Sequence, residues 1–291
     1  MMKMNPVFRK ELKLGVRTKS LPIILVIYNA VLAVIGLVFF YSLLQQMRWS
    51  GNISYSTMTQ LYIVLSCVEF GLLVFIVLAL TANAICGERE RQTLDILLTT
   101  RMSTWNIISG KLMSSISIVI LLIVSSIPVL SLIFVFGGVN LLDLLKTVLY
   151  LIFIAFYIAA IGMACSARFK KTTTATVMTY AGVCLIGFGT LFIVFISIMI
   201  VSVRSGYMTE SIGLFSLLLL INPGVTFAAM LVNQVGYMGE ISALLIRYGV
   251  PKFVGNHWII VSIIVQVVII ALFMFMANRR LNPLRKRRRH P

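Results

Sequence analysis

Charged side chains are missing from long stretches of this sequence. Six runs of 21 to 32 residues contain none: residues 20–47, 112–142, 147–167, 172–203, 211–239 and 253–278. A bilayer core of roughly 30 Å is crossed by about 20 helical residues. With 60% hydrophobic residues and a mean hydropathy of +1.03, the chain does not fit the soluble globular class. The sequence therefore predicts an all-α polytopic membrane protein.

Six apolar segments are expected to be full transmembrane helices. One of them lies between Arg48 and Glu88, where only Glu69 is charged. The six expected spans are residues 21–47, 57–86, 104–136, 144–167, 172–203 and 256–278. The first is too long for the apolar core of a signal peptide, about 7–15 residues, and no small-residue cleavage pattern follows it. We therefore expect it to remain as an anchor.

The apolar run that begins at Ser211 decides the topology. If it is not a full span, both termini lie on one side, together with 20 of the 25 basic residues. The positive-inside rule then places both termini in the cytoplasm. A turn signal near the middle of the run supports this choice: Asn222, Pro223 and Gly224. We expect residues 211–248 to form outer re-entrant or interfacial helices of a single transmembrane domain.

Both ends of the chain are basic. Residues 5–19 start at an Asn-Pro pair that is typical of a helix N-terminus, and basic side chains gather on one face: Arg9, Lys10, Lys13 and Arg17. This pattern predicts an amphipathic helix in the membrane interface, the alternative being a merely solvated basic start. The tail, residues 279–291, is expected to retain topology and contact anionic lipids rather than nucleic acid.

A segment that contains acids follows the second span directly. Five of the 33 charged residues fall between positions 88 and 95, among them Glu88, Glu90 and Asp95, which are three of only eight acids. Three leucines share a side at i, i+3, i+4 spacing: Leu94, Leu97 and Leu98. We expect a helix over residues 88–100 across the cytoplasmic end of the membrane domain. The alternative is a loop helix held by its own Glu–Arg pairs, worth about 0.3–0.5 kcal/mol each.

These residues resemble the signature of ABC-2 type transporter permeases, whose usual form is E-x-E-x-G-T-L-[DE]-x-L-L-x-x-P. The matching positions are Glu88, Glu90, Thr93, Leu94, Asp95, Leu97 and Leu98. Gln92 departs from it, because Gly is commonest there, and Arg101 stands near the usual Pro. Three further parts of the chain resemble the family's elbow helix (residues 5–19), its fourth-to-fifth connection (residues 161–166 with 172–176) and its outer re-entrant region (residues 219–223).

The resemblance implies a membrane subunit driven by a partner. In this family the segment that matches residues 88–100 is a coupling helix, which seats in a groove of a cytoplasmic ATPase subunit. The ATPase-coupling residues implied here are Glu88, Arg89, Glu90, Arg91, Thr93, Leu94, Asp95, Leu97 and Leu98. The leucines would bury on the partner, while Glu88, Arg91 and Asp95 would pair with charges of its groove.

The resemblance implies partner chains that bind ATP, for which this chain has no motif. The sequence has no G-x-x-x-x-G-K-[ST] phosphate loop, so ATP and Mg are expected on the partner. The resemblance implies two ABC ATPase subunits and a second permease copy or paralogue, in the plasma membrane of a prokaryote. The implied activity is the export or flipping of an amphiphilic molecule such as a peptide, an antibiotic, a lipid-like compound or a drug.

Glu69 lies midway along the second expected span. An ionised carboxylate that faced lipid there would cost on the order of 2.5–3.5 kcal/mol. We therefore expect it to face protein. It then belongs to the translocation path or a dimer interface, or it binds a hydroxyl group such as that of Ser125, Ser126 or Thr190.

Two other function classes remain open. A membrane-embedded lipid-modifying enzyme would need paired acids or a His/Asp cluster, whereas the dense acid group here is interleaved with arginines. A stand-alone secondary transporter would use several buried ionisable groups and broken inverted-repeat helices. No catalytic residue is predicted, and no metal site, because the four cysteines lack ligand spacing.

Overall fold

The computed structural model describes residues 7–9, 11, 20–50, 55–94, 103–135, 140–205, 213–236 and 238–281. Every regular element in these ranges is helical. The chain separates into two compact units. Unit 1 comprises Met1–Thr179 with Phe273–Pro291, and unit 2 comprises Tyr180–Leu272.

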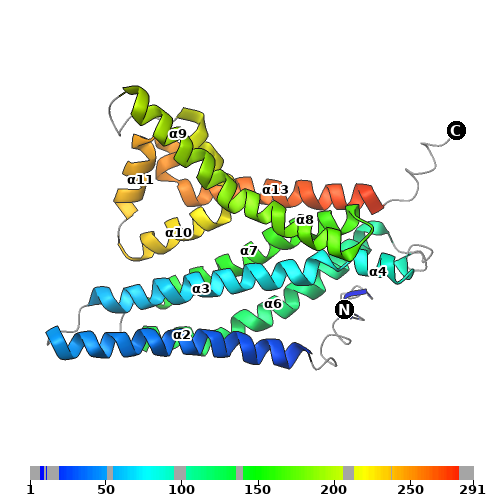
Figure 1. Cartoon of the computed structure of the whole chain (residues 1–291), viewed down its shortest axis with the longest axis horizontal. Helices are drawn as coiled ribbons and strands as arrows, with labels where there is room; N and C mark the ends of the chain where they lie inside the picture. Colours follow the sequence, from blue (N-terminus) through cyan, green and yellow to red (C-terminus); the bar gives the residue numbers. More distant parts are fainter. Residues whose placement is uncertain are drawn as a thin grey trace. The chain divides into compact units, whose positions relative to one another are not determined.

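Unit 1 is built on four long helices that run side by side (Figure 1). They are α2 (Ser20–Ser50), α3 (Tyr55–Ala82), α6 (Thr104–Val135) and α7 (Leu141–Arg168). α7 packs on α3 and α6, and α2 packs on the same two helices. In the apolar stretch of α7 67% of the residues are buried, against 11% in α2. α7 is therefore the central helix of this unit.

α3 and α7 approach each other closely at Gly162. A Cβ atom at this position would lie 2.1 Å from Thr81 Oγ1. Small residues permit such backbone approaches between membrane helices. Elsewhere on the same pair of helices, the buried hydroxyl of Tyr62 lies 2.5 Å from Thr147 Oγ1. The two helices thus share both apolar and polar contacts.

Unit 2 contains shorter helices. The π-helical turn η1 (Leu185–Gly189) links α8 (Thr172–Cys184) to α9 (Thr190–Ser205). η2 (Gly213–Ile221), α10 (Pro223–Gln234), α11 (Met238–Arg247) and α12 (Lys252–Asn256) follow, before α13 (Trp258–Leu281). α13 starts in this unit and passes into unit 1 at Phe273. The apolar core of unit 2 consists of Leu220, Ala229, Leu245, Val250 and Trp258.

The number of expected spans agrees with the structure. In the part of the chain that is described, six helical segments are long and apolar enough to cross a membrane. They are Leu21–Gln46, Thr59–Glu90, Thr104–Ser131, Leu141–Arg168, Thr172–Val203 and Trp258–Leu281. η2 and α10 qualify only when taken together, and the chain bends by 87° between them.

The terminal predictions fall largely outside the described residues. Of the helix expected over residues 5–19, the structure describes Val7, Phe8, Arg9 and Glu11, all of them helical. Val7 is buried. Of the basic tail, Arg279 and Arg280 form the last turn of α13, and residues 282–291 lie outside the described ranges.

Candidate functional site

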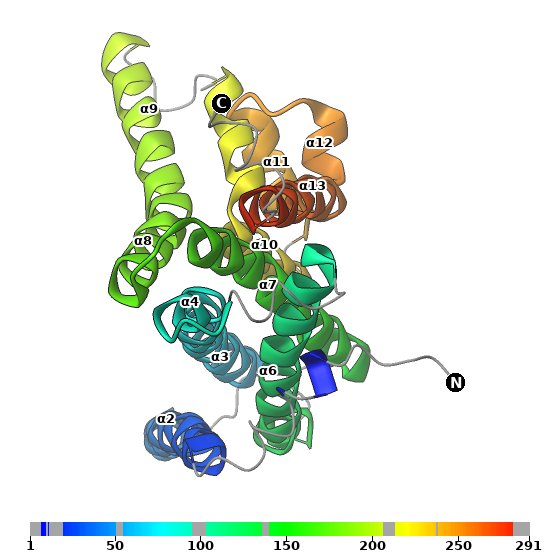
Figure 2. The same cartoon turned by 90° about the vertical axis from the view of Figure 1, so that its right-hand side faces the viewer.

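The acid-containing segment starts with the short helix α4 (Cys86–Glu90), at the end of α3 (Figure 2). The first N–H groups of a helix have no acceptor within it. Here the hydroxyl oxygen of Ser166 on α7 accepts hydrogen bonds from the backbone nitrogens of Ile85 (3.0 Å) and Cys86 (2.9 Å). The start of α4 is therefore held by the end of α7.

Arg89 binds the C-terminal end of α7. Its Nη1 donates to the carbonyl oxygen of Phe169 at 2.6 Å, and its Nη2 donates to that of Ala167 at 3.2 Å. The last carbonyl groups of a helix lack intrahelical donors, and the helix dipole favours a cation there. The guanidinium group thus supplies hydrogen-bond donors and a positive charge at the C-terminal end of α7.

Glu90 binds the start of the next helix. Its carboxylate accepts two hydrogen bonds from Thr172, the first residue of α8, through the backbone nitrogen and the hydroxyl group. These contacts lower the pKa of the Glu90 carboxyl, with the bond from the Thr172 backbone as the main cause. Glu90 and Arg89 therefore hold the two sides of the connection between α7 and α8.

Glu88 faces a third helix, α6. Its carboxylate pairs with Lys111 Nζ at 3.2 Å, and the same Nζ lies 3.0 Å from the carboxylate of Glu11. Lys111 is 5% exposed. The hydroxyl of Thr93 also donates to the Glu88 carboxylate. The ion pairs thus join the N-terminal helical residues, α4 and α6 around one buried cation.

The expected helix over residues 88–100 does not form as one continuous element, because α4 ends at Glu90. Gln92 has a φ of 58°, in the left-handed region. Thr93 N donates to Glu88 O and Gln92 N donates to Arg89 O, which is the Schellman pattern of a helix C-terminus. Glycine is the usual residue at such a position. This geometry gives a physical reason for the Gly of the ABC-2 signature, where this chain has Gln92.

The exposed part of the α4 segment is the turn that follows this helix. Arg91, Gln92 and Thr93 are exposed, whereas Leu94 is 5% exposed and is buried within its own chain. The other predicted coupling residues, Asp95, Leu97 and Leu98, lie outside the described residues. Glu88 and Arg89 are partly covered and make contacts inside the chain.

Sequence reasoning missed the partners of the α4 segment. Lys111, Ser166 and Thr172 come from α6, α7 and α8, and they lie 23, 80 and 82 positions from the residues that they bind. One signal was present for Lys111, a lone basic residue directly before the uncharged run of residues 112–142. Such a cation inside an apolar helix requires an acidic partner.

Glu69 lies in a separate polar cluster of unit 1 and is fully buried. Its Oε1 accepts hydrogen bonds from the hydroxyl groups of Tyr28 on α2, at 3.1 Å, and Ser126 on α6. Its Oε2 has no hydrogen-bond partner among the described residues. Of the three hydroxyls considered from the sequence, Ser126 is the one that binds Glu69. Ser125 accepts from Asn29, and Thr190 accepts from Asn222.

The predicted outer turn lies in unit 2, where η2 meets α10. Asn222 is 2% exposed and is the N-cap of α10, with Pro223 as the first helical residue. The Asn222 side-chain oxygen accepts from the backbone nitrogens of Gly224 (2.9 Å) and Val225 (3.4 Å). The Asn-Pro-Gly sequence thus ends one helix and starts the next at the 87° bend.

Comparison with known proteins assigns the family. The model for ABC-2 family transporter protein matches residues 46–278, which is most of the chain and includes Glu69, the α4 segment and Asn222. A search of the curated proteins found no match. The family match agrees with the resemblance of Glu88–Leu98 to the permease signature. This chain belongs to the ABC-2 family of transporter proteins, as a membrane-spanning permease.

Proposed function

We propose that this permease subunit exports or flips an amphiphilic molecule, using ATP that is hydrolysed by separate ABC ATPase subunits. The substrate classes that remain are peptides, antibiotics, lipid-like compounds and drugs. The working assembly includes a second permease copy or paralogue, in the plasma membrane of a prokaryote. The positive-inside rule supports a cytoplasmic location for both termini, because the six-span topology gathers 20 of the 25 basic residues on their side.

One observation carries the coupling part of this proposal. Three consecutive side chains of α4 bind three different helices: Glu88 binds α6, Arg89 binds α7 and Glu90 binds α8. Hydrogen bonds in which one partner is charged are stronger than those between neutral groups. A displacement of α4 therefore pulls on all three helices at once. A segment that receives movement from an ATPase subunit needs this property.

The contacts assign two different roles to the residues of the signature. Glu88, Arg89 and Glu90 bind inside the chain and transmit movement. Arg91 and Gln92 are exposed at the turn, and we assign them to the surface that meets the ATPase subunit. The predicted coupling residues after Leu94 extend that surface. This division revises the sequence-based expectation that Glu88 itself pairs with the partner, because its carboxylate is already paired with Lys111.

A photocrosslinking residue at Arg91 tests the docking surface. In membranes of the native host, we expect it to link the permease to an ATP-binding chain. A crosslinker at Leu142, which is exposed at the opposite end of α7, is the matched control and should not form that link. Crosslinks from Arg91 to lipid alone would contradict the proposal.

Charge substitutions then test coupling in the purified complex. Arg91→Glu should lower the ATPase rate of the assembled complex, because the turn then carries the opposite charge toward the partner. Arg91→Lys should keep most of the rate. Equal rates for the wild type and Arg91→Glu, with the complex still assembled, would show that this turn does not couple the two subunits.

A further inference from the structure

Asn222 uses both ends of its side-chain amide. The oxygen caps α10, as described above. The nitrogen, Nδ2, donates to the carbonyl oxygen of Gly187 at 2.8 Å and to Thr190 Oγ1 at 2.9 Å. Gly187 belongs to η1 and Thr190 is the first residue of α9, so the amide joins the bend to a segment more than 30 positions earlier in the chain.

The acceptors of Asn222 lie at an irregularity of the fifth span. A π-helical turn shifts the hydrogen-bond register by one residue, and such turns are frequent at functional sites. The Thr190 hydroxyl donates back to the carbonyl oxygens of Ile186 (2.7 Å) and Gly187 (3.2 Å). The polar groups of the turn therefore gather around one buried amide. A bilayer core offers no water to replace these bonds.

Gln266 of α13 binds residues on both sides of the bend. Gln266 is fully buried, and its Nε2 donates to Leu220 O (3.2 Å) and Thr226 Oγ1 (3.0 Å). The Thr226 hydroxyl lies 3.3 Å from the carbonyl oxygen of Asn222. The bend between η2 and α10 is thus bound on one side by η1 and α9 and on the other by α13.

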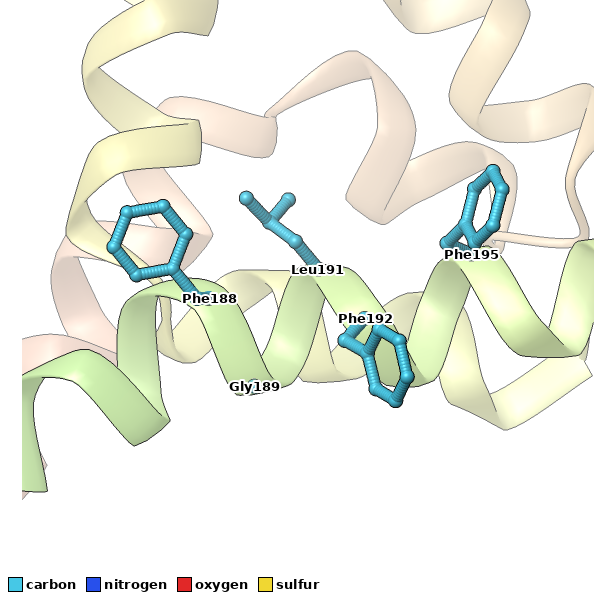
Figure 3. Close-up of a pocket in the computed structure, with 5 residues that line it drawn as sticks. All are labelled: Phe188, Gly189, Leu191, Phe192 and Phe195. Carbon is cyan, nitrogen blue, oxygen red and sulfur yellow. The ribbon is translucent and has the colours of Figure 1, made fainter. Parts of the chain in front are cut away.

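An apolar hollow adjoins the π-helical turn (Figure 3). It has a volume of about 530 Å³ and is lined by Phe188, Gly189, Leu191, Phe192 and Phe195. The rings of Phe188 and Phe195 and the side chain of Leu191 point to the same side of the helix in Figure 3. Phe188 directly follows Gly187, whose carbonyl oxygen is held by Asn222. The position of this ring therefore depends on the turn that Asn222 binds.

We infer that Asn222 is a positioning residue that fastens the bend to the π-helical turn, so that the bend and the Phe188–Phe195 hollow move as one body. Two features carry the inference: the two donor contacts of the buried amide, and the sequence adjacency of Gly187 and Phe188. During any rearrangement of unit 2 the hollow then keeps its orientation to α10. The inference goes beyond the proposed function and does not depend on an ATPase partner.

Substitutions at Asn222 and Thr190 separate the donor role of the Asn222 amide nitrogen from the N-cap role of its oxygen. Asn222→Ser keeps a good N-cap oxygen but removes the amide donor, and Asn222→Ala removes both. Thr190→Val removes one acceptor and leaves the cap intact. Asn140→Ser is the matched control, because Asn140 stands at the N-cap of α7 and makes no side-chain cap bond.

Spin-label distances measure the link in the full chain, reconstituted in phosphatidylcholine nanodiscs. One label is placed on the exposed native Cys184, directly before η1, and the other on Ala228→Cys, exposed on α10. The other native cysteines are replaced, as Cys67→Ala, Cys86→Ser and Cys165→Ala. We expect one narrow distance distribution in the wild type and in Asn140→Ser.

In Asn222→Ser we expect a second distance population to rise by roughly tenfold, the effect of losing a buried hydrogen-bond donor. Unchanged helix content by circular dichroism would exclude global unfolding as the cause. An unaltered distribution in Asn222→Ser would overturn the inference. If Asn222→Ser and Asn222→Ala do not fold, Thr190→Val decides: a broadened distribution supports the link, and a wild-type distribution contradicts the part of it that runs through Thr190.

Discussion

Glu90 accepts two hydrogen bonds from Thr172, one from the backbone nitrogen and one from the hydroxyl, each 2.8 Å long. The carboxylate therefore lies at the first residue of α8, where backbone N–H groups have no intrahelical acceptor. Arg89, its neighbour in sequence, binds the carbonyl groups at the end of α7. Two adjacent side chains thus hold both sides of the connection of residues 169–171.

Removal of the Glu90 carboxylate is expected to loosen the start of α8. In Glu90→Ala the Thr172 amide loses its acceptor, so its hydrogen exchange should accelerate by roughly tenfold. Exchange mass spectrometry of the peptide that contains Thr172 measures this. Arg91→Ala, at an exposed neighbour, is the control and should leave that peptide unchanged. Equal exchange in Glu90→Ala and wild type would mean that the contact does not order α8.

Lys111 is expected to be far more sensitive to substitution than an exposed lysine of unit 1. Lys111→Met leaves the carboxylates of Glu88 and Glu11 without their shared cation, which should lower the free energy of unfolding by about 1–3 kcal/mol. Unfolding in mixed detergent micelles measures the change. Lys146→Met is the matched control, because Lys146 is exposed and pairs with Asp143 on the same helix. Its expected effect is below about 0.5 kcal/mol.

Gln92→Gly is expected to stabilise the protein. An L-residue in the left-handed region is strained by roughly 1–2 kcal/mol, and glycine is not. The greater entropy of glycine in the unfolded chain offsets part of this, which leaves a gain of about 0.5–1 kcal/mol. Arg91→Gly, at a φ of −78°, should instead destabilise by a similar amount. Equal shifts from both variants in detergent unfolding would contradict the role assigned to φ.

The Glu69 cluster is expected to depend on an acceptor oxygen rather than on charge. Glu69→Gln keeps an oxygen for Tyr28 and Ser126, so stability should change by less than about 1 kcal/mol. Glu69→Leu leaves two buried hydroxyl groups without their acceptor and should cost about 1–3 kcal/mol for each. Thermal unfolding of the two variants measures the difference. If Gln is as damaging as Leu, a negative charge is required at this position.

Gly162 is expected to tolerate no side chain. Gly162→Ala puts a methyl group 2.1 Å from Thr81 Oγ1, so the helices must separate, at a cost of about 1–3 kcal/mol. Adding Thr81→Ala removes the nearest atom and should recover part of the loss. Gly71→Ala is the control, since no atom lies within 4 Å of its added Cβ, and it should stabilise α3 by up to about 1 kcal/mol. Similar losses in both alanine variants would argue against the close approach.

The spacing of charges was enough to predict the main features of the fold. A span of about 20 apolar residues has few alternatives to a membrane helix, so six spans could be identified before any contact was known. The Asn-Pro-Gly turn also located the 87° bend. In both cases the determinant is local in sequence, because it depends on composition or on a few adjacent residues.

The site could be predicted only in part. The signature located the α4 segment, but Leu94, expected on a partner, is buried within the chain, and Glu88 is paired with Lys111. The contacts of Ser166 and Thr172 depend on how α3, α7 and α8 pack, and no periodicity encodes that. The left-handed conformation of Gln92 could not be predicted from the helical pattern, because glutamine fits that pattern. Only the Gly at this place in the family signature indicated it.

The contacts between α3 and α7 define a mechanical element. The two helices run in the same direction, since Tyr62 of α3 meets Thr147 of α7 near their starts, and Cys86, in α4 directly after α3, binds Ser166 near the end of α7. Along α7 the two contacts, at Thr147 and Ser166, are 19 residues apart, a length of roughly 30 Å. A pair fixed at both ends cannot slide or splay without breaking a buried hydrogen bond. If α4 receives movement from an ATPase subunit, as proposed above, the two helices would therefore be displaced together rather than one against the other.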